Sequence, residues 1–474
     1  MHNSKLFDLL RTFETSEWKE FHRYLISKVK DDAEVMQLYT YIFKYRKNLG
    51  HKKLEQSYTN SEIFRNKTTK SFLNLMSLLN SHIHDFITIK NLLGDENDKA
   101  VHLAIALNKR KLYAQAHSNY ETAIEEVQKN TLDLWTSYRL HKLAHIFHLS
   151  YNRTRADHTA FYLSESLKQN KISKKATNLL HQLMLYVNKD VYHKDLTADI
   201  NTLSEENRKN HAHNHLIELL EHMYTCISTQ DSNSYYHLYD KVISHDQQHI
   251  SQELGALCYN IMINYQNSRI RLGNGGSISE LYEIYKKGVS SQSILVDQQI
   301  KDAPFMQYIH AAAATHQFIE ARNAIKQYQH LLAPNNKESV LTISEATILL
   351  YEGKNDESNQ LLLSTKLSDR KTKNHGRILE LINDTVLNKD KEFIKARITN
   401  FKRTYRNHNS KFSQDQLKGA ERLCEVLSAI SQNNYNHALK LINTPDEPLI
   451  RRSWLKSYVE KKQSRSFRFG LSGN

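Results

Sequence analysis

The stretch LAIALNKRKLYAQAHSNYETA, residues 103–123, carries the pattern from which we predict the fold. Ala104 and Ala116 are twelve residues apart, and in an antiparallel helix pair this separation puts one residue near the middle of each helix. Small side chains at those positions permit close approach of the two helices. We therefore predict a helical hairpin, whose other small, apolar and aromatic positions are Leu103, Leu107, Tyr113, Tyr120 and Ala123.

The spacing of twelve between small or aliphatic residues recurs along the chain. The other pairs are Ala144 with Ala156, Ile309 with Ala321, Ala346 with Ser358, and Val426 with Ala438. An aromatic residue stands three positions before the second member in several units, namely Tyr113, Phe318 and Tyr435, with Phe393 before Ala396 as a further candidate. The pairs therefore predict several copies of one hairpin.

The second members of these pairs give the period of the repeat. Ala321, Ser358, Ala396 and Ala438 are separated by 37, 38 and 42 residues, and Ala116 and Ala156 by 40. A unit of this length is one helical hairpin, which cannot cover its own apolar faces and must stack on its neighbours. Between Ala156 and Ala321 the pattern is weaker, and we expect helices near residues 216–227, 235–243, 254–271 and 278–289.

Glycine and proline are scarce, so we expect helix almost throughout. No proline occurs before Pro304, the first 254 residues contain only Gly50 and Gly94, and the 474-residue chain has 12 Gly and 4 Pro. These two residue types supply most tight turns and helix ends. We predict an all-α, right-handed α-solenoid of stacked hairpins. The alternative is an irregular helical bundle in which the spacing is accidental.

The chain divides into three expected parts. Residues 1–95 form an N-terminal helical cap, because apolar stripes such as Leu6, Leu9, Leu10 and Phe13 precede a break at Gly94. Residues 96–449 form the helical repeats. Residues 450–474 form a basic C-terminal capping helix followed by a flexible tail.

Five segments carry a resemblance to a known family. They are LFDLLRTFETSEWKEFHRYLIS (6–27), NGGSISELYEIYKKGV (274–289), QFIEARNAIKQYQHLL (317–332), ILLYEGKNDESNQLLL (348–363) and RRSWLKSYVE (451–460). Together they resemble a family of tetratricopeptide-like helical repeat proteins of uncharacterised function from Bacteroidetes, over nearly the full length. The resemblance implies a fold, and it implies no catalytic residue.

A histidine stripe is the best candidate for a metal site. His211, His215, Glu218 and His222 would project from one face of a helix, and the first two histidines with Glu218 form a possible clamp for a transition metal. The competing interpretation is a solvated helix start in a chain with 26 histidines. No cysteine or second helical ligand motif completes the stripe, so we expect no metal site and no cofactor.

Motifs for catalysis are absent from the sequence. There is no Gly-x-Ser-x-Gly elbow and no phosphate-binding Walker loop. The loop from Gly273 to Gly276 lies between two helical runs, not after a strand, and is expected to let one hairpin turn. Cys226, Cys258 and Cys424 are far apart and are expected to be free, buried thiols. We therefore predict a protein that is not an enzyme and has no catalytic residue.

The basic surplus supports a second hypothesis. The formal net charge is +14, and cations gather at residues 370–411 and 451–468. Lys395, Lys402 and Arg406 would line one helical face near Phe401 and Tyr405, where cations and aromatic rings suit phosphates and bases. The competing interpretation makes Phe393 and Phe401 the apolar side of a repeat helix and leaves the cations in solvent.

These observations favour a scaffold. Stacked hairpins create a concave surface that suits an extended peptide or a partner helix. We predict a non-catalytic adaptor that binds a protein or peptide partner there, with polyanion or nucleic-acid binding as the alternative. The N-terminus has no long apolar run typical of a signal peptide, and no stretch is apolar enough for a membrane span, so we expect no membrane contact and a cytoplasmic location.

Overall fold

The computed structural model describes residues 4–29, 33–55, 59–60, 64, 68–94, 96–129, 135–151, 156–187, 214–244, 250–296, 298–406 and 414–470. Within these ranges the regular secondary structure is helical, and β-type pairing is limited to two isolated bridges, Val296 with Gln299 and Ile300 with Leu332. The prediction of an all-α protein is confirmed. None of the described helices is both long enough and apolar enough to cross a membrane.

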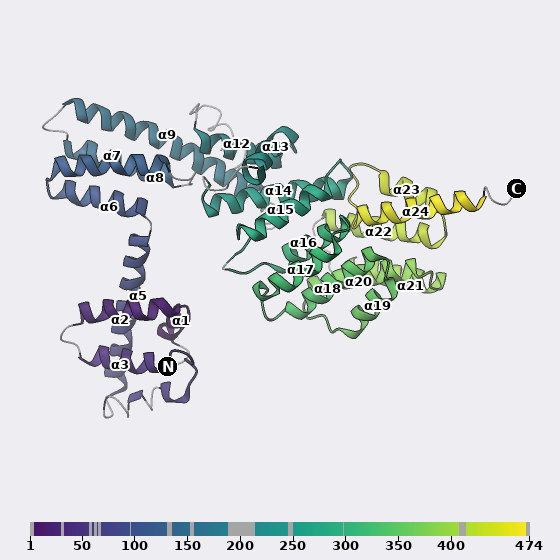
Figure 1. Cartoon of the computed structure of the whole chain (residues 1–474), viewed down its shortest axis with the longest axis horizontal. Helices are drawn as coiled ribbons and strands as arrows, with labels where there is room; N and C mark the ends of the chain where they lie inside the picture. The colour runs from purple at the N-terminus through teal and green to yellow at the C-terminus, as the bar shows by residue number, and fades with distance from the viewer. Residues whose placement is uncertain are drawn as a thin grey trace. The chain divides into compact units, whose positions relative to one another are not determined.

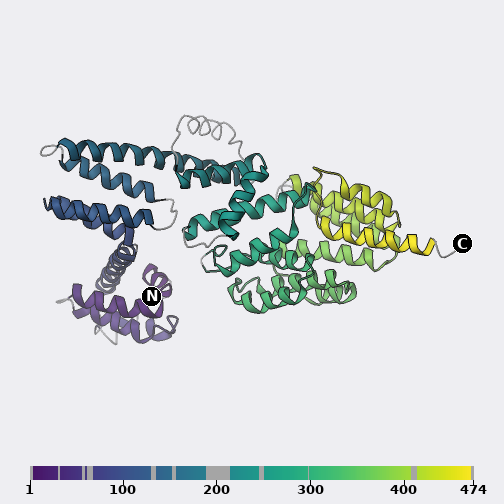
Figure 2. The ribbon, with the colours of Figure 1, turned by 45° about the horizontal axis from the view of Figure 1, so that its top comes forward.

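The chain forms two compact units. The first comprises Met1–Lys129 and Lys142–Leu163, and the second comprises Asn130–His141 and Ser164–Asn474. Figure 1 labels their helices, and Figure 2 shows the ribbon from a second direction.

The first unit contains two separate apolar cores. The first core is rich in aromatic rings, and it includes Phe7, Trp18, Phe21 and Tyr39, whose hydroxyl donates to the carbonyl oxygen of Trp18 at 2.7 Å. It is built by α1 (Lys5–Arg11), α2 (Thr15–Lys28), α3 (Ala33–Lys44), the short helix η1 (Lys52–Leu54) and α5 (Thr69–Gly94).

The second core of this unit contains the stretch from which the fold was predicted. Ala104, Ala116 and Tyr120 are buried together with Phe147 and Tyr162. Its helices are α6 (Glu96–Lys109), α7 (Tyr113–Lys129), α8 (Thr136–Tyr151) and the N-terminal part of α9 (Ala156–Val187).

The second unit consists mainly of successive helix pairs. Within it, first helices of neighbouring pairs pack on one another, as α16 does on α18, α18 on α20, and α20 on α22. The three cysteines are free and buried, as predicted. The pairs are α12 (His215–Ser228) with α13 (Ser232–Tyr239), α14 (Gln252–Leu272) with α15 (Ile278–Ser290), α16 (Asp302–Ala314) with α17 (Phe318–Tyr328), α18 (Lys337–Glu352) with α19 (Asn355–Ser364), α20 (Arg370–Val386) with α21 (Lys391–Arg406), and α22 (Gln414–Ser431) with α23 (Tyr435–Asn443).

Three shorter or terminal elements complete this unit. They are η2 (Asp240–Ser244) after α13, η4 (Gln329–Leu331) after α17, and the C-terminal helix α24 (Arg452–Gly470). The four helices expected in the weakly patterned region correspond to α12, α13, α14 and α15, with α13 ending earlier than expected because η2 takes over at Asp240.

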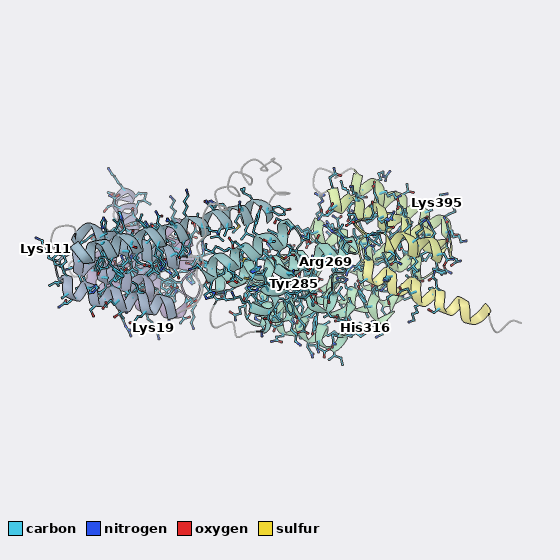
Figure 3. All side chains as sticks on the ribbon, turned by 90° about the horizontal axis from the view of Figure 1, so that it is seen from above. Lys19, Lys111, Arg269, Tyr285, His316 and Lys395 are labelled. Carbon is cyan, nitrogen blue, oxygen red and sulfur yellow. The ribbon has the colours of Figure 1, made fainter. Side chains whose placement is uncertain are left out.

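One turn geometry recurs between the helices of the pairs. A turn residue one or two positions after the first helix has φ between 57° and 80°. The N–H of this residue donates to the carbonyl three residues before it, and the N–H of the following residue donates to the carbonyl five residues before itself. This arrangement is the Schellman motif, which satisfies the last carbonyls of a helix. The left-handed residues are Lys111, Gly273, His316, Gly353, Asn388 and Asn433. Lys111 and His316 are labelled in Figure 3. Only two of the six are glycine, which is how a glycine-poor chain ends its helices.

The turn explains the spacing of twelve. In four hairpins one member of the pair stands seven residues before the left-handed residue and the other stands five residues after it. All eight members have an exposed fraction of 0%: Ala104 and Ala116, Ile309 and Ala321, Ala346 and Ser358, and Val426 and Ala438. The contact is direct in one hairpin, where the Ser358 hydroxyl donates to the carbonyl oxygen of Ala346 at 2.9 Å. The side chain of Ala156 lies outside the described residues.

The prediction for Phe393 and Ala396 is wrong. Phe393 is 43% exposed and Ala396 is exposed, whereas Ile394 is buried. After the left-handed Asn388 the chain uses one more residue before its second helix, because Asp390 accepts from the N–H groups of Glu392 and Phe393 and thereby caps α21. The added residue puts the inward-facing position at Ile394, six residues after Asn388 instead of five, whereas Ala396, eight residues after it, faces solvent.

We expect Gly353→Ala to destabilise the second unit by about 1 kcal/mol, because an L-residue with a Cβ is strained at φ +80°. The matched control is Gly94→Ala at the end of α5. At both positions nothing lies within 4 Å of an added Cβ, but Gly94 has no left-handed φ, so its substitution leaves stability unchanged or slightly raised. Urea unfolding followed by circular dichroism measures both. Equal effects of the two substitutions would contradict the role of the turn.

Candidate functional site

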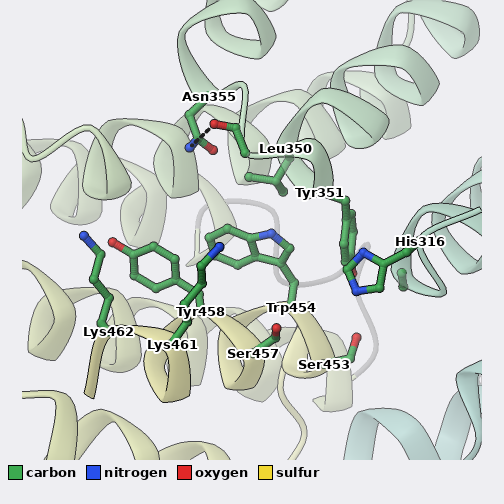
Figure 4. Close-up of a pocket in the computed structure, with 12 residues that line it drawn as sticks. His316, Leu350, Tyr351, Asn355, Ser453, Trp454, Ser457, Tyr458, Lys461 and Lys462 are labelled. Carbon is green, nitrogen blue, oxygen red and sulfur yellow. Dashed lines mark hydrogen bonds between the residues drawn. The ribbon is translucent and has the colours of Figure 1, made fainter. Parts of the chain in front are cut away.

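A pocket of about 320 Å³ lies beside α24, against the C-terminal ends of α16 and α18. Figure 4 shows Trp454 at its centre, with Tyr351 and His316 on one side and Tyr458 on the other. The lining comes from helices that are far apart in sequence, so the pocket depends on how the hairpins and α24 pack.

Arg452 fixes the start of α24. Its buried guanidinium donates to the carbonyl oxygens of Arg271 at 3.1 Å, of Thr444 at 3.2 Å, and of Ile442 and Glu447. These carbonyls lie near the end of α14, in the last turn of α23 and in the segment that follows it, so a single cation joins both elements to α24. The N–H of Leu449 also donates to the carbonyl oxygen of Arg271, at 3.1 Å.

Arg451 points into the interior of the unit. Its guanidinium faces the hydroxyls of Tyr351 and of Thr347, the latter at 3.5 Å, and burial lowers its pKa. In the part of the chain that the structure describes, no carboxylate forms an ion pair with it. Arg451 is half-buried, and a cation partly removed from water without a carboxylate is a candidate for binding an anion.

Two histidines lie close to Arg451. Burial is the main cause that holds the pKa of His310 well below its usual value. Burial also lowers the pKa of His375 to about 4. The nearby Arg451 cation lowers the pKa of both histidines further. His310 Nε2 is 2.9 Å from the hydroxyl oxygen of Tyr351. The two imidazoles are therefore neutral at pH 7, and Arg451 remains the charged group of this cluster.

The Asp369 carboxylate, which acts on the pKa of His375, already accepts hydrogen bonds from the backbone. Its Oδ1 accepts from the N–H groups of Lys371 at 2.6 Å and of Thr372 at 3.2 Å, which caps α20. Asp369 therefore acts on this cluster through its charge at a distance and forms no ion pair with Arg451.

The mouth of the pocket combines aromatic rings with lysines. Trp454 and Tyr458 stack with centroids 5.2 Å apart and an interplanar angle of 11°, and Lys462 lies 5.5 Å from the Tyr458 ring centroid. Lys461 also lines the pocket. A ligand with an apolar group and a carboxylate or phosphate matches this lining.

One buried polar atom of the lining, Asn355 Oδ1, has no hydrogen-bond partner among the described residues. Buried polar atoms are usually paired with protein groups or ordered water, so this oxygen is free to accept from a water molecule or a ligand.

The histidine stripe is only partly assembled as predicted. His211 lies outside the described residues, whereas His215, Glu218 and His222 lie on α12, with His215 Nδ1 3.6 Å from Glu218 Oε2. His222 stacks on His237 of α13, with centroids 4.0 Å apart. Burial is the largest cause that lowers the pKa of His222, followed by the charge of His237. Sequence reasoning missed His237, because nothing in its own segment marks it as a neighbour of the stripe.

The basic cluster at 370–411 differs from a nucleic-acid platform. Phe401 and Tyr405 are buried, with ring centroids 4.7 Å apart, as the interpretation of an apolar helix face expects for Phe401, whereas Phe393, which that interpretation placed on the same face, is 43% exposed. Arg397 forms ion pairs with Glu380 at 2.7 Å and Asp384 at 3.2 Å.

The remaining cations of the two basic clusters point in different directions. Lys395 is exposed, with its Nζ 3.6 Å from Glu392 Oε2 on the same helix. The side chain of Arg406 lies outside the described residues. In the C-terminal cluster Arg451 and Arg452 point inward, whereas Lys456 and Lys461 are exposed. The charge pattern of the sequence did not separate the inward cations from the outward ones.

Comparison of the chain with protein-family models, with curated proteins and with solved structures found no match. The site must therefore be interpreted from its own residues.

The low pKa of His375 makes stability depend on pH. Its pKa is about 4 in the folded protein against 6.5 for an ordinary histidine, so the unfolded chain binds an extra proton between these values. Stability is thus full above pH 6.5 and falls as the pH drops towards 4, by about 3 kcal/mol from this group alone. We expect His375→Gln to flatten the curve of unfolding free energy against pH over this window. His316→Gln, at an exposed histidine, should leave its slope unchanged; an unchanged slope in the His375 variant would contradict the assignment.

Proposed function

We propose that the protein is a non-catalytic helical-repeat scaffold that binds an acidic segment of a protein partner in the pocket beside α24. The observation that supports this most directly is Arg451, a half-buried guanidinium that faces the pocket-lining residue Tyr351, with two neutral histidines beside it and no carboxylate partner among the described residues. A carboxylate from a partner would supply the missing charge.

The chemistry of arginine favours a carboxylate or phosphate as the ligand. The guanidinium is planar and always charged, and it binds such groups through two parallel hydrogen bonds. Removing a lone buried charge from water is unfavourable, whereas a paired and hydrogen-bonded one is tolerated. Binding of an anion near Arg451 therefore gains more free energy than the same contact at a solvated lysine.

The dimensions of the pocket favour a short segment of a partner. A volume of about 320 Å³ is at the lower end of the range for small-ligand sites, so it accommodates a few side chains. The stacked Trp454 and Tyr458 rings provide an apolar surface for one of them, and Lys461 and Lys462 lie where a second acidic group of the same segment would reach.

The finer description of the fold belongs to the same proposal. We infer a right-handed α-solenoid from the repeated turn and from the packing of successive first helices. Residues 1–95 as a cap, 96–449 as repeats and 450–474 as a capping helix and tail remain the proposed parts. The buried free thiols suit a reducing compartment, in line with the predicted cytoplasmic location.

Polyanion binding is the second candidate function. The net charge of +14 and the exposed cations Lys395 and Lys461 favour it. The buried rings of Phe401 and Tyr405 favour it less, because bases need exposed aromatic faces to stack on.

The proposal is tested with a fluorescent, Glu-rich peptide that contains a single Leu. We expect it to bind the wild-type chain, and we expect a matched peptide with Gln in place of Glu to bind at least about tenfold more weakly, because the charge pair is lost. Fluorescence polarisation measures both affinities. The double substitution Lys461→Glu and Lys462→Glu should weaken binding of the acidic peptide, whereas Lys456→Glu, on the exposed side of the same helix, should not.

Arg451→Met separates a binding role from a structural one. It should remove peptide binding while leaving the melting temperature unchanged or raised, since replacing an unpaired buried charge by an apolar group is neutral or stabilising. Equal binding of the Glu and Gln peptides would refute the acidic-segment proposal. Tighter binding of a single-stranded oligonucleotide, lost on substitution of cations at 370–411, would favour the polyanion alternative.

A further inference from the structure

The hairpin of α12 and α13 brings together three side chains that can bind a metal ion. Glu218 and His222 are one turn apart on α12, and His237 faces them from α13. One carboxylate oxygen and two imidazole nitrogens from these residues all lie within 4.8 Å of one another. The two helices pack through buried residues, including Met223, Cys226, Tyr235 and Leu238.

The surroundings already orient one of the imidazoles. Asp231 Oδ2 accepts from the N–H of Ser234 at 2.7 Å, which fixes the first turn of α13. Ser234 Oγ then lies 3.3 Å from His222 Nδ1. A hydrogen bond to one ring nitrogen leaves the other, Nε2, as the metal ligand, and this is the usual arrangement around protein-bound metals.

The second imidazole has an unsatisfied nitrogen. His237 Nε2 is buried and has no hydrogen-bond partner among the described residues. Its ring stacks on that of His222 with an interplanar angle of 27°, so the two rings present their edges side by side. A metal ion would satisfy this nitrogen.

We propose that Glu218, His222 and His237 form a binding site for a divalent transition-metal ion of the Zn²⁺ type. A set of two imidazoles and one carboxylate suits ions of the Zn²⁺ type, whereas Mg²⁺ and Ca²⁺ prefer oxygen ligands. Ligand atoms at about 2.0–2.2 Å from a zinc ion lie roughly 3.3 Å apart in a tetrahedral site. The distances between the three ligand atoms therefore have to shorten by about an ångström when the ion binds. Glu218 is exposed and has the freedom to make that movement.

Two neighbouring side chains act on the Glu218 carboxylate. The Lys241 ammonium is the largest cause that lowers the pKa of Glu218, so a metal ion has to compete with it. His215 lies 3.6 Å from the same carboxylate, on the preceding turn of α12. It is placed to hold Glu218 or to supply a fourth ligand.

This site differs from the one that the sequence suggested. A clamp of His211 and His215 would lie along one helix, and no second helix was seen to complete it. The structure brings His237 across the hairpin, fifteen residues after His222. The expectation of no metal site rested on that missing ligand.

The test uses the untagged full-length chain, freed of metal with a chelator. We expect titration with Co²⁺ to develop visible absorption from one ion per chain at imidazole and carboxylate ligands, Zn²⁺ to displace it, and Mg²⁺ to have no effect. Zinc should also raise the melting temperature of the wild-type chain, because it binds only the folded state of this site.

The chain has 26 histidines, so substitutions must separate this site from weak binding elsewhere. Glu218→Gln is nearly isosteric and at an exposed position, so the variant folds, and it should weaken zinc binding at least about tenfold. His237→Phe keeps the stacked ring and should do the same. His437→Phe, at an exposed histidine of α23, is the control and should bind as the wild type does. Unchanged zinc affinity in both site variants, or no Co²⁺ absorption in the wild type, would overturn the proposal.

Discussion

Each hairpin depends on a close contact between its two helices. One residue of this contact stands seven positions before the left-handed turn residue, and the other stands five positions after it. The backbone hydrogen bonds of the turn fix this register, because they end the first helix at the turn, and the second helix begins two positions after the left-handed residue. Where both members are small or aliphatic, as with Ala346 and Ser358, the helices approach until side chain and backbone touch. Four hairpins in two separate units share this register.

The same constraint places the functional groups. Because α16 and α18 end at equivalent turns, His316 and Gly353 stand at corresponding positions and the last residues of both helices face α24. Arg452 then ties α24 to the end of α14 through carbonyl oxygens, without any carboxylate. The neighbouring Arg451 is thereby carried into the interior. The position of Arg451 follows from the way α24 is anchored. Arg452 alone makes the hydrogen bonds to the end of α14.

The sequence predicts the repeat better than the sites, for a physical reason. Spacing within a hairpin is local, so Ala104 with Ala116 and Val426 with Ala438 could be found by counting residues. The prediction at Phe393 and Ala396 failed because an aromatic residue three positions before an alanine also occurs on the exposed side of α21, and the sequence does not show that the turn lies at Asn388. Arg451 and His237 were missed because their partners come from other helices, and local charge and spacing carry no information about which way an arginine points.

Both candidate sites are places where the interior departs from good local pairing. The core of the second unit is mainly apolar, and its buried carboxylate Asp384 is matched by the cations of Lys389 and Arg397. Arg451 lacks such a match, and His237 Nε2 lacks a hydrogen bond. Proteins keep local conflicts of this kind mainly where function requires them.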